Sequence, residues 1–302
     1  MSKKNLTITI GIPAYNEEAN IGLLLENIRR QKIKGAIIKK IIVVSDRSED
    51  NTASIVNSIN DRRITLIDNK KRKGLNLSEN EIMKKASTDI LVIFNGDVLP
   101  ADSNCVNELV KPLITNNNIG IVGAHIVTLP ASKLFERIIS FSHTFKDSIY
   151  IRMNKGRNIY MCHGRGRAFN KTFYKNFTLP LNAPEDSYSY LKCIKEGFLF
   201  EYANKATVLF RSPDTYRDHL KQIARFFDGK ERLRKYFDKN FVNDSFRIPL
   251  KTLFIEFIQQ KKENILMLIA YIGINIYSQV RRRLMHIDHI AYNPSDSTKK
   301  LF

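Results

Sequence analysis

Short apolar runs in the first half of the chain alternate with segments whose apolar residues recur every three or four positions. The runs span 6–12, 41–45, 64–67, 90–94 and 119–127. The segments between them have helical periodicity, and the first of these places Ile21, Leu24 and Ile28 on one face. Strands that alternate with helices of this length predict crossover connections and a mostly parallel sheet in an α/β fold.

The second half of the chain is predicted to be mainly helical. Helices are expected at about 135–152, 184–196, 214–236 and 248–284, and a strand at 198–210. The segment 160–169 bears glycines and reads as irregular, and residues 293–302 read as a disordered tail. These elements predict a first, α/β domain over 1–236, a helical extension over 237–292 and the tail.

Polar residues follow three of the predicted strands directly. Ligands of parallel sheets bind at the carboxyl ends of the strands. The residues at these three ends are Pro13, Ala14, Tyr15, Asn16 and Glu17, then Asp46 to Asp50, then Asn95, Gly96 and Asp97. Helix capping accounts for an aspartate such as Asp50 or Asp102 but poorly for Asp97, because Val98-Leu99-Pro100 separates it from the next helix. We expect the three clusters to converge on one crevice.

Several nucleotide-binding classes lack their motif here. No Gly-x-Gly-x-x-Gly follows the first strand, and the chain has no Walker loop. A nucleotidyltransferase with a similar sheet would need a glycine- and arginine-rich loop at the first strand end, where this chain has Pro13-Ala14-Tyr15-Asn16. These absences disfavour a dinucleotide-binding domain, a Walker-type enzyme and a nucleotidyltransferase.

The charge balance calls for an anionic partner. The 302 residues are 43% hydrophobic, enough for a core, and carry 49 Lys and Arg against 30 Asp and Glu, a net charge of +19. Nucleic acid, an anionic membrane, a phosphorylated substrate and plain solvated lysines all fit this charge. Nucleic acid is not expected as a partner, because no nucleic-acid motif is present and the acidic strand ends would repel phosphate. The three cysteines, at 105, 162 and 193, are too dispersed for a disulfide framework or a zinc site, which favours a reduced, cytoplasmic setting.

Five segments in chain order together resemble a known family. They are Ile10-Gly-Ile-Pro-Ala-Tyr-Asn-Glu-Glu18, Val44-Ser-Asp-Arg-Ser-Glu-Asp50, Phe94-Asn-Gly-Asp97, Pro184-Glu-Asp186 and Gln222-Ile-Ala-Arg-Phe226. Over about residues 7–236 the chain resembles a family-2 glycosyltransferase, an inverting, nucleotide-sugar-dependent class. The resemblance implies the GT-A fold, a Rossmann-like, mostly parallel central sheet flanked by helices, here with a helical C-terminal extension. It also implies an enzyme of the hexosyltransferase type that uses a nucleotide-sugar donor, a UDP-sugar being favoured.

The resemblance assigns a nucleotide-sugar site to the strand ends. Its residues would be Pro13, Ala14, Tyr15, Glu17, Asp46, Lys73, Asn95, Gly96, Asp97, Gly164 and Arg165. Asp46 would hold the base or ribose, or else serve as a turn or cap residue. Lys73 would approach the diphosphate, or else belong to a solvated charge run over 70–73. Arg165 and Arg167 would contact phosphate, and His163 would contact the sugar or phosphates or be structural.

The departing nucleoside diphosphate develops negative charge, and a divalent cation held by a carboxylate neutralises it. Mg²⁺ or Mn²⁺ prefers oxygen ligands and keeps several waters, so one or two carboxylates suffice. By resemblance Asp97 is the metal ligand. The family motif is Asp-x-Asp, and its first position is Asn95 here, which offers an amide oxygen without charge. We therefore expect weaker metal binding.

The same resemblance assigns catalysis to two further motifs. Inversion needs a base that removes the proton of the acceptor hydroxyl. Asp186 would be that base and Glu185 would position the acceptor, although acids at a helix start are common. Gln222 and Arg225 match a Gln-x-x-Arg-Trp element, in which Arg225 would stabilise the leaving diphosphate and Gln222 would hold donor or acceptor. Phe226 replaces the Trp, which favours addition of one or a few sugars over processive polymerisation.

An apolar stretch near the carboxyl end has basic flanks. Residues 265–280 lie between Lys261-Lys262 and Arg281-Arg282-Arg283, and they include polar residues that make a transmembrane span weak. The stretch fits an interfacial helix on an anionic leaflet or a helix packed on the catalytic domain. With a glycan or lipid-linked acceptor, the enzyme would work at the inner face of the cell membrane. A basic nucleic-acid-binding protein and an inactive GT-A scaffold are the alternatives.

Overall fold

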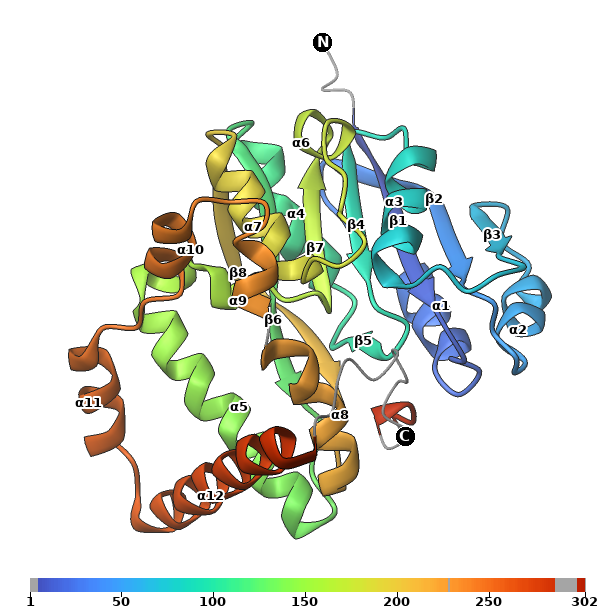
Figure 1. Ribbon diagram of the computed structural model, residues 1–302. Helices are drawn as coiled ribbons and strands as arrows, with labels where there is room; N and C mark the ends of the chain where they lie inside the picture. The colour runs from blue at the N-terminus through green and yellow to red at the C-terminus, as the bar shows by residue number, and fades with distance from the viewer. Residues whose placement is uncertain (1–4, 228, 286–297, 302) are drawn as a thin grey trace.

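The computed structural model describes residues 5–227, 229–285 and 298–301 (Figure 1). Its centre is an eight-stranded sheet in the order β3-β2-β1-β4-β7-β6-β8-β5. The strands are β1 Leu6–Ala14, β2 Ala36–Ser45, β3 Ile64–Asp68, β4 Ile90–Phe94, β5 Val98–Pro100, β6 Ile119–Thr128, β7 Gly166–Asn170 and β8 Leu199–Phe210. The strands β1 to β4 pair in parallel, as do β6 and β8, whereas β7 and β5 run antiparallel to their neighbours. The prediction of an α/β fold with a mostly parallel sheet is confirmed.

Helices connect the strands and form the extension. They are α1 Ile21–Arg29, α2 Thr52–Ser58, α3 Leu75–Lys85, α4 Cys105–Thr115, α5 Leu134–Arg152, α6 Lys171–Lys175, α7 Glu185–Lys195, α8 Tyr216–Phe227, α9 Gly229–Leu233, α10 Lys239–Ser245, α11 Leu250–Ile258 and α12 Lys262–Met285, with the 3-10 turns η1 Asn154–Gly156 and η2 Ile159–Met161. The segment predicted as irregular over 160–169 contains the start of β7. The helical region predicted over 248–284 is two helices, α11 and α12, and the single helix predicted over 214–236 is divided between α8 and α9.

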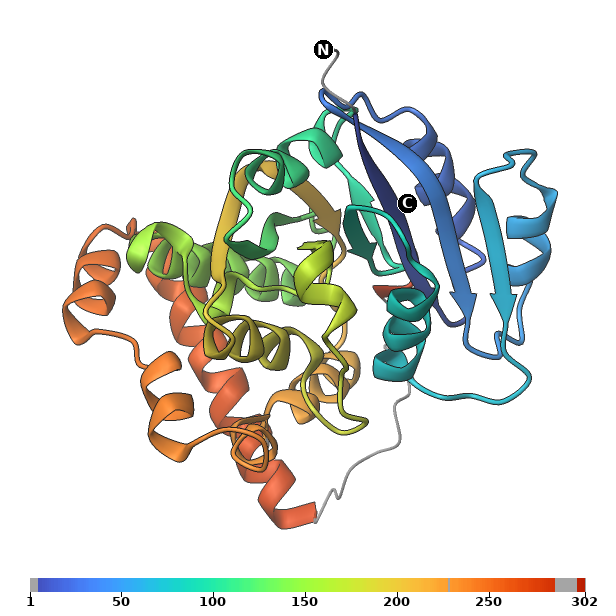
Figure 2. The same cartoon turned by 90° about the horizontal axis from the view of Figure 1, so that it is seen from above.

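The core consists of two apolar layers, one on each face of the sheet (Figure 2). Strand residues alternate between them, because successive side chains of a strand point to opposite faces. In β2, Ile41 and Val43 pack with α1, α2 and α4, whereas Ile42 and Val44 pack with α3, α6 and α7. A Cβ on Gly11 would lie 2.3 Å from Cγ2 of Ile82, so glycine is what lets α3 lie close on β1.

The chain between β4 and β5 forces the sheet to curl. Four strand spacings separate β4 from β5 in the sheet order, which is about 19 Å if the sheet were flat. Four Cα–Cα steps from Phe94 to Val98 span at most about 15 Å. The β8 edge must therefore bend toward the carboxyl end of β4. The residues Asn95, Gly96 and Asp97 bridge this bend, which gives the third polar cluster its position.

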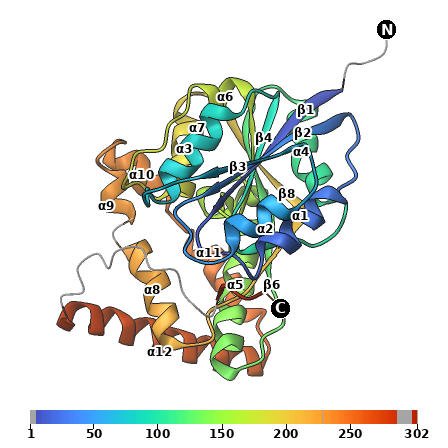
Figure 3. The same ribbon diagram turned by 90° about the vertical axis from the view of Figure 1, so that its right-hand side faces the viewer.

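The extension lies beneath the sheet, where α8 and α12 run beside each other (Figure 3). Both α11 and α12 contact α5. None of the helices within the described ranges is long and apolar enough to cross a membrane. Part of the predicted tail differs from the expectation: Thr298 and Leu301 are buried against the catalytic domain, with exposed fractions of 6% and 1%. The boundary at 236 stays a prediction.

Candidate donor and catalytic site

The loops that follow β1 and β2 are joined by hydrogen bonds into one surface. The backbone N–H of Asn16 donates to Oγ of Ser48 over 3.1 Å, and the N–H of Glu49 donates to Oδ1 of Asn16 over 2.8 Å. The N–H of Glu17 donates to Oγ1 of Thr52 over 2.7 Å. Asn16 has a φ of 53°, in the left-handed region that asparagine tolerates better than most residues. The first two predicted polar clusters therefore meet.

Asp46 is 5% exposed and holds the loop before α3 by hydrogen bonds. Its Oδ1 accepts from the N–H of Lys73 and its Oδ2 from the N–H of Gly74, both over 2.7 Å. These bonds give Asp46 a structural role in joining two loops, but neither α2 nor α3 has a side-chain cap, so Asp46 is not a helix cap. Each carboxylate oxygen has a second lone pair, so contact with a base or ribose stays a prediction. Asp46 also donates its N–H to the carbonyl of Ala14 over 2.8 Å, which ties it to the end of β1.

The basic run that follows places its members differently. Nζ of Lys73 donates to Oδ1 of Asn69 over 2.8 Å and pairs with Oε2 of Glu81 over 3.2 Å. In this arrangement Lys73 points toward α3 and β3, and its contact with a diphosphate stays a prediction. The guanidinium of Arg72 lies 3.9 Å from the centre of the Tyr15 ring, a cation–π contact that sequence reasoning missed.

Three oxygen-bearing side chains gather where β1 and β4 end. A Cβ on Gly96 would lie 2.7 Å from Cγ of Glu17, so Glu17 packs directly against the Asn95–Asp97 bridge. Burial, and then the nearby carboxylate of Asp97, raises the pKa of Glu17 to about 7. Oδ1 of Asn95 is buried and has no hydrogen-bond partner within the described part of the chain. A buried acceptor without a partner is costly, which marks it as a place for a ligand.

These residues fit a divalent cation that is shared with its substrate. Asp97 offers a carboxylate and Asn95 its unpartnered amide oxygen, both hard ligands suited to Mg²⁺ or Mn²⁺. Among the described residues no cluster of three or more His, Cys, Asp and Glu is arranged for a metal. The remaining ligands would be water and donor phosphates, as Mg²⁺ sites usually have.

The glycine-bearing segment links this bridge to the acidic pair of α7. Phe94 pairs with Gly166 in antiparallel register, so the residues after Phe94 lie beside those before Gly166. A Cβ on Gly164 would lie 2.5 Å from Oε1 of Glu185, so this glycine lies against the acidic pair. The structure therefore brings the predicted metal-binding bridge and the predicted catalytic pair to one site.

Glu185 and Asp186 begin α7, as predicted. Oδ1 of Asp186 accepts from the backbone N–H of Ser187 over 2.5 Å and from its hydroxyl over 3.1 Å. Burial, and then the adjacent Asp186, raises the pKa of Glu185 to about 7. The Glu185 carboxyl is therefore partly protonated near neutral pH, so it can hold a hydrogen bond beside Asp186 without a full second charge.

The expectation that Arg167 contacts phosphate is wrong. Arg167 is fully buried, and its Nη2 donates to Oε1 of Glu79 over 2.6 Å. Its Nη1 donates to Oγ of Ser189 over 2.9 Å and to the backbone carbonyl of Glu185 over 3.2 Å. Residue 167 is an interior position of β7 that faces the α3 and α7 layer, so its charge is satisfied inside the protein. Arg165 lies two residues away with its guanidinium 3.9 Å from the centre of the Phe210 ring.

Two asparagines of α3 brace the loop that leads into α7. Asn80 exchanges two hydrogen bonds of 2.8 Å with the backbone of Leu179. Nδ2 of Asn76 donates to the carbonyls of Pro180 and Ala183 over 2.6 and 2.9 Å. The signal in the sequence is a pair of asparagines one helical turn apart, and only the fold shows which loop they hold.

The remaining predicted residues differ in how the structure places them. Burial, and then the charge of Arg165, lowers the pKa of His163 to about 3, so its imidazole is neutral. Its Nε2 is buried without a hydrogen-bond partner in the described structure. Gln222 lies on α8 and is partly exposed. The side chains of Arg225 and Phe226 lie outside the described residues.

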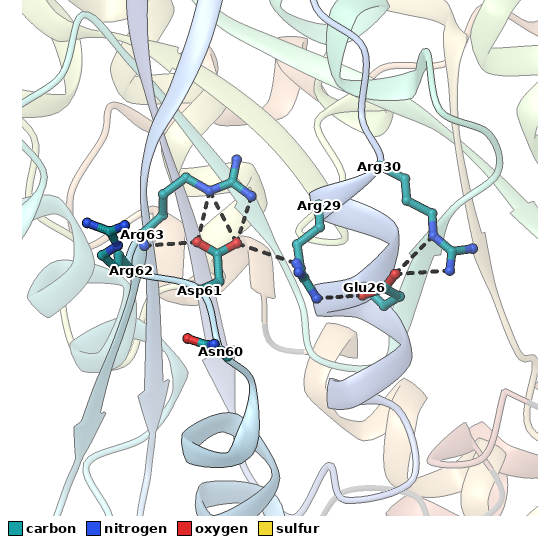
Figure 4. Close-up of a pocket in the computed structure, with 7 residues that line it drawn as sticks. All are labelled: Glu26, Arg29, Arg30, Asn60, Asp61, Arg62 and Arg63. Carbon is teal, nitrogen blue, oxygen red and sulfur yellow. Dashed lines mark hydrogen bonds and ion pairs between the residues drawn. The ribbon is translucent and has the colours of Figure 1, made fainter.

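A surface hollow of about 650 Å³ lies at the opposite edge of the sheet (Figure 4). Asp61 lies between Arg63 and Arg29, at 2.7 and 3.6 Å, and Glu26 lies between Arg29 and Arg30. These residues precede β3 or lie at the end of α1, so they are at the amino ends of the strands. Because parallel sheets bind ligands at the carboxyl ends, we place the site there and not in this hollow.

The family model of glycosyl transferase family 2 matches residues 9–178. The match covers more than half of the chain and includes the strand ends that carry Tyr15, Asp46 and Asp97. The chain belongs to glycosyl transferase family 2. It is a glycosyltransferase.

Individual relatives agree with the family assignment. The O-antigen chain rhamnosyltransferase RfbN of Salmonella typhimurium is 22% identical over 233 residues, 74% of this chain and 71% of the relative. A mannosyltransferase from Pyrobaculum calidifontis, solved with GDP-Man and Mn²⁺, superposes with a TM-score of 0.61 at 17% identity, covering 93% of this chain and 84% of that one. Glucosyl-3-phosphoglycerate synthase from Mycobacterium tuberculosis gives 0.52 at 16%, covering 74% and 79%. The family-2 chain thus has the GT-A fold.

Proposed function

We propose that this family-2 enzyme transfers a sugar from a nucleotide-sugar donor to a hydroxyl of a glycan or lipid-linked saccharide, with inversion, in polysaccharide or glycoconjugate biosynthesis. The observations that support it are that Glu17 packs on Gly96, next to Asp97, and that Gly164 lies against Glu185. Phe94, just before the bridge, pairs with Gly166 on the same strand pair. Together they support a site that combines a cation-binding edge with an acidic pair. The O-antigen chain rhamnosyltransferase relative supports a polysaccharide product, and the donor is a UDP-sugar by preference.

In the proposed reaction Asp186 accepts the proton of the acceptor hydroxyl as that oxygen attacks the anomeric carbon. Glu185, with its raised pKa, donates or accepts a hydrogen bond at the acceptor without adding a full second charge. Tyr15, Asp46 and the β1 end hold the nucleotide. When bound to Asp97 and Asn95, a divalent cation supplies positive charge for the leaving diphosphate.

A donor screen tests the nucleotide preference. We expect UDP and UDP-sugars to raise the unfolding temperature, and more so with Mn²⁺ than without it. A shift with GDP alone would contradict the UDP preference and leave glycosyl transfer in place. Strongly salt-dependent binding of DNA, without any nucleotide effect, would favour the nucleic-acid alternative instead.

Three aspartate variants then test the roles with the matched donor. Asp186→Asn should lower turnover by about 10²–10⁴-fold while nucleotide binding persists. Asp97→Asn should abolish the part of the thermal shift that depends on Mn²⁺. Asp102→Asn, at an exposed position near the start of α4, is the matched control and should change neither. Full turnover in both site variants would refute the assigned roles, whereas a wild type that binds nucleotide but has no turnover would favour the inactive scaffold.

We further propose that the enzyme docks on an anionic membrane leaflet through α11 and α12. The outward side chains of these helices are large, apolar and exposed, namely Leu250, Phe254, Phe257, Ile258, Leu266, Ile269, Ile272, Ile276, Tyr277 and Val280. Leu250 is 82% exposed and Leu266 is 71% exposed, so packing on the protein does not bury these side chains. Exposed apolar patches of this kind mark interaction sites. The exposed Lys251 and Lys261 lie beside this apolar face, which suits anionic headgroups.

The inward side of the two helices has polar contacts as well as the buried Leu268, and these polar contacts support the same orientation. Nε of Arg152 on α5 pairs with Oε2 of Glu256 over 3.0 Å, and Nζ of Lys146 donates to the hydroxyl of Tyr271 over 2.9 Å. A surface helix normally buries its apolar side and exposes its polar side. On α11 and α12 the exposed side is apolar, whereas the inner side carries polar contacts. This arrangement supports a packed helix and an interfacial helix together, since the helices pack on α5 and leave an apolar face for a bilayer.

Vesicle sedimentation tests this surface. We expect binding to vesicles with anionic lipid, weaker binding to neutral vesicles, and loss of binding in Leu266→Glu combined with Ile269→Glu. Leu23→Glu, at a 44% exposed leucine on α1, is the control. If the wild type instead ignores vesicles and forms a dimer that the double variant abolishes, a second copy covers the face and the membrane proposal is refuted.

A further inference from the structure

The carboxyl-terminal segment Thr298–Leu301 contacts the turn that follows β1. Nζ of Lys299 donates to the carbonyl of Asn16 over 2.7 Å, pairs with Oε1 of Glu17 over 3.0 Å and also donates to the carbonyl of Tyr15. The Lys299 side chain is only 17% exposed. One ammonium thus satisfies acceptors from three successive residues, and its three N–H donors are all used.

The segment is held by residues from distant parts of the chain. Asn20, 1% exposed, donates from Nδ2 to the carbonyl of Lys299 over 2.6 Å and accepts from the N–H of Leu301 over 3.1 Å. Arg211 donates to the carbonyls of Lys300 and Leu301 over 2.9 and 2.8 Å. The Leu301 side chain is buried with Leu99, near the end of β5. The segment therefore contacts the start of α1, strand β5 and the end of β8.

The turn that Lys299 contacts belongs to the proposed donor site. Asn16 has a left-handed backbone there, a conformation that persists only when its surroundings fix it. Glu17 packs against Gly96, one residue from Asp97. The ammonium of Lys299 thus adds a positive charge directly at this acidic edge.

We propose that the segment Thr298–Leu301 is part of the donor site, and that Lys299 is a positioning residue that holds the turn Tyr15–Glu17 in the conformation that receives the donor's nucleoside diphosphate. This inference rests on the proposed function. It gives the carboxyl end of the chain a role in substrate binding. It also explains why Lys299 is surrounded by hydrogen-bond acceptors from the residues that end or follow β1.

Titration calorimetry of UDP with Mn²⁺ tests the role of Lys299 without using turnover; GDP replaces UDP if only GDP shifts the unfolding temperature of the wild type. Lys299→Met keeps the aliphatic stem and removes the ammonium, and it should weaken nucleotide binding by about tenfold or more. Lys299→Arg, which retains the charge, should recover most of the affinity. Lys111→Met, at an exposed lysine of α4, should bind like the wild type. With the matched donor, KM should rise more than kcat falls.

A chain that ends at residue 297 provides a second variant. It should lose nucleotide affinity as Lys299→Met does, while urea unfolding shows that it still folds. Unchanged or tighter nucleotide binding in either variant, with the wild type binding normally, would overturn this inference alone, the tighter case meaning that the segment blocks the site. A wild type that binds no nucleoside diphosphate would overturn the proposed function and this inference together.

Discussion

Arg167 of β7 and Glu79 of α3 form an ion pair of 2.6 Å beneath the acidic pair of α7, and both side chains are fully buried. Burial raises the pKa of Glu79, and the charge of Arg167 opposes that rise. The same guanidinium donates to the backbone carbonyl of Glu185 and to Ser189. Three elements are therefore fixed to one another at the place where the proposed base is presented.

Removing one partner of this pair should destabilise the protein strongly. Arg167→Met leaves the Glu79 carboxylate buried without compensation, and we expect a loss of about 3–5 kcal/mol in the free energy of unfolding, measured by urea denaturation. The double variant Arg167→Met with Glu79→Met should regain most of that stability. Its kcat should stay low, because the start of α7 has lost its anchor. A double variant with normal kcat would show that the pair is structural only.

Adding a methyl group at Gly164 should displace the Glu185 carboxylate. The new Cβ would lie 2.5 Å from Oε1 of Glu185, and the end of that flexible side chain must move. We expect Gly164→Ala to lower kcat while the nucleotide affinity, measured by calorimetry, changes little. Gly273→Ala on α12 is the control, because nothing lies within 4 Å of its Cβ. It should stabilise the protein by up to about 1 kcal/mol, since alanine favours helix over glycine.

Asn95→Asp should raise the affinity of the site for the metal and lower the stability of the metal-free protein. Oδ1 of Asn95 is buried without a partner, so a carboxylate there adds charge close to Glu17 and Asp97. We expect the metal-free variant to lose about 1–3 kcal/mol of stability and its affinity for Mn²⁺ in the presence of UDP to rise about tenfold. Thermal unfolding with and without Mn²⁺ measures both. Equal Mn²⁺ affinity in variant and wild type would mean that residue 95 is not a ligand.

The central sheet could be predicted because its signals are local. Continuous apolar runs such as 90–94 mark strands buried on both faces, and the polar residues after them mark the edge that binds ligands. The short strands β5 and β7 escaped prediction. β5 has three residues, and β7 contains Arg167, whose charge hides a fully buried position. No local pattern shows that Glu79 compensates that charge from 88 residues away.

Contacts with other segments also show what the sequence alone did not reveal at the site. The charge run 70–73 suggests phosphate binding. The structure shows in addition that Lys73 forms an ion pair with Glu81, which lies in the following helix α3. The last residues are polar and resemble a disordered tail, but Asn20 and Arg211 supply the partners that order residues 299–301. In each case the partners lie at separations along the chain that sequence periodicity does not encode.

Replacing Glu185 by glutamine should change how stability depends on pH. The pKa of Glu185 is raised from 4.5 to about 7, by burial first and by Asp186 second. The folded protein therefore retains a proton that the unfolded chain releases, and the free energy of unfolding falls as the pH rises from 4.5 through 7. Glu185→Gln has no such proton to lose. It should match the wild type near pH 4.5 and exceed it by about 1–3 kcal/mol at pH 8, measured by urea unfolding at both pH values. A difference that does not grow with pH would place the Glu185 carboxyl in water, at its ordinary pKa.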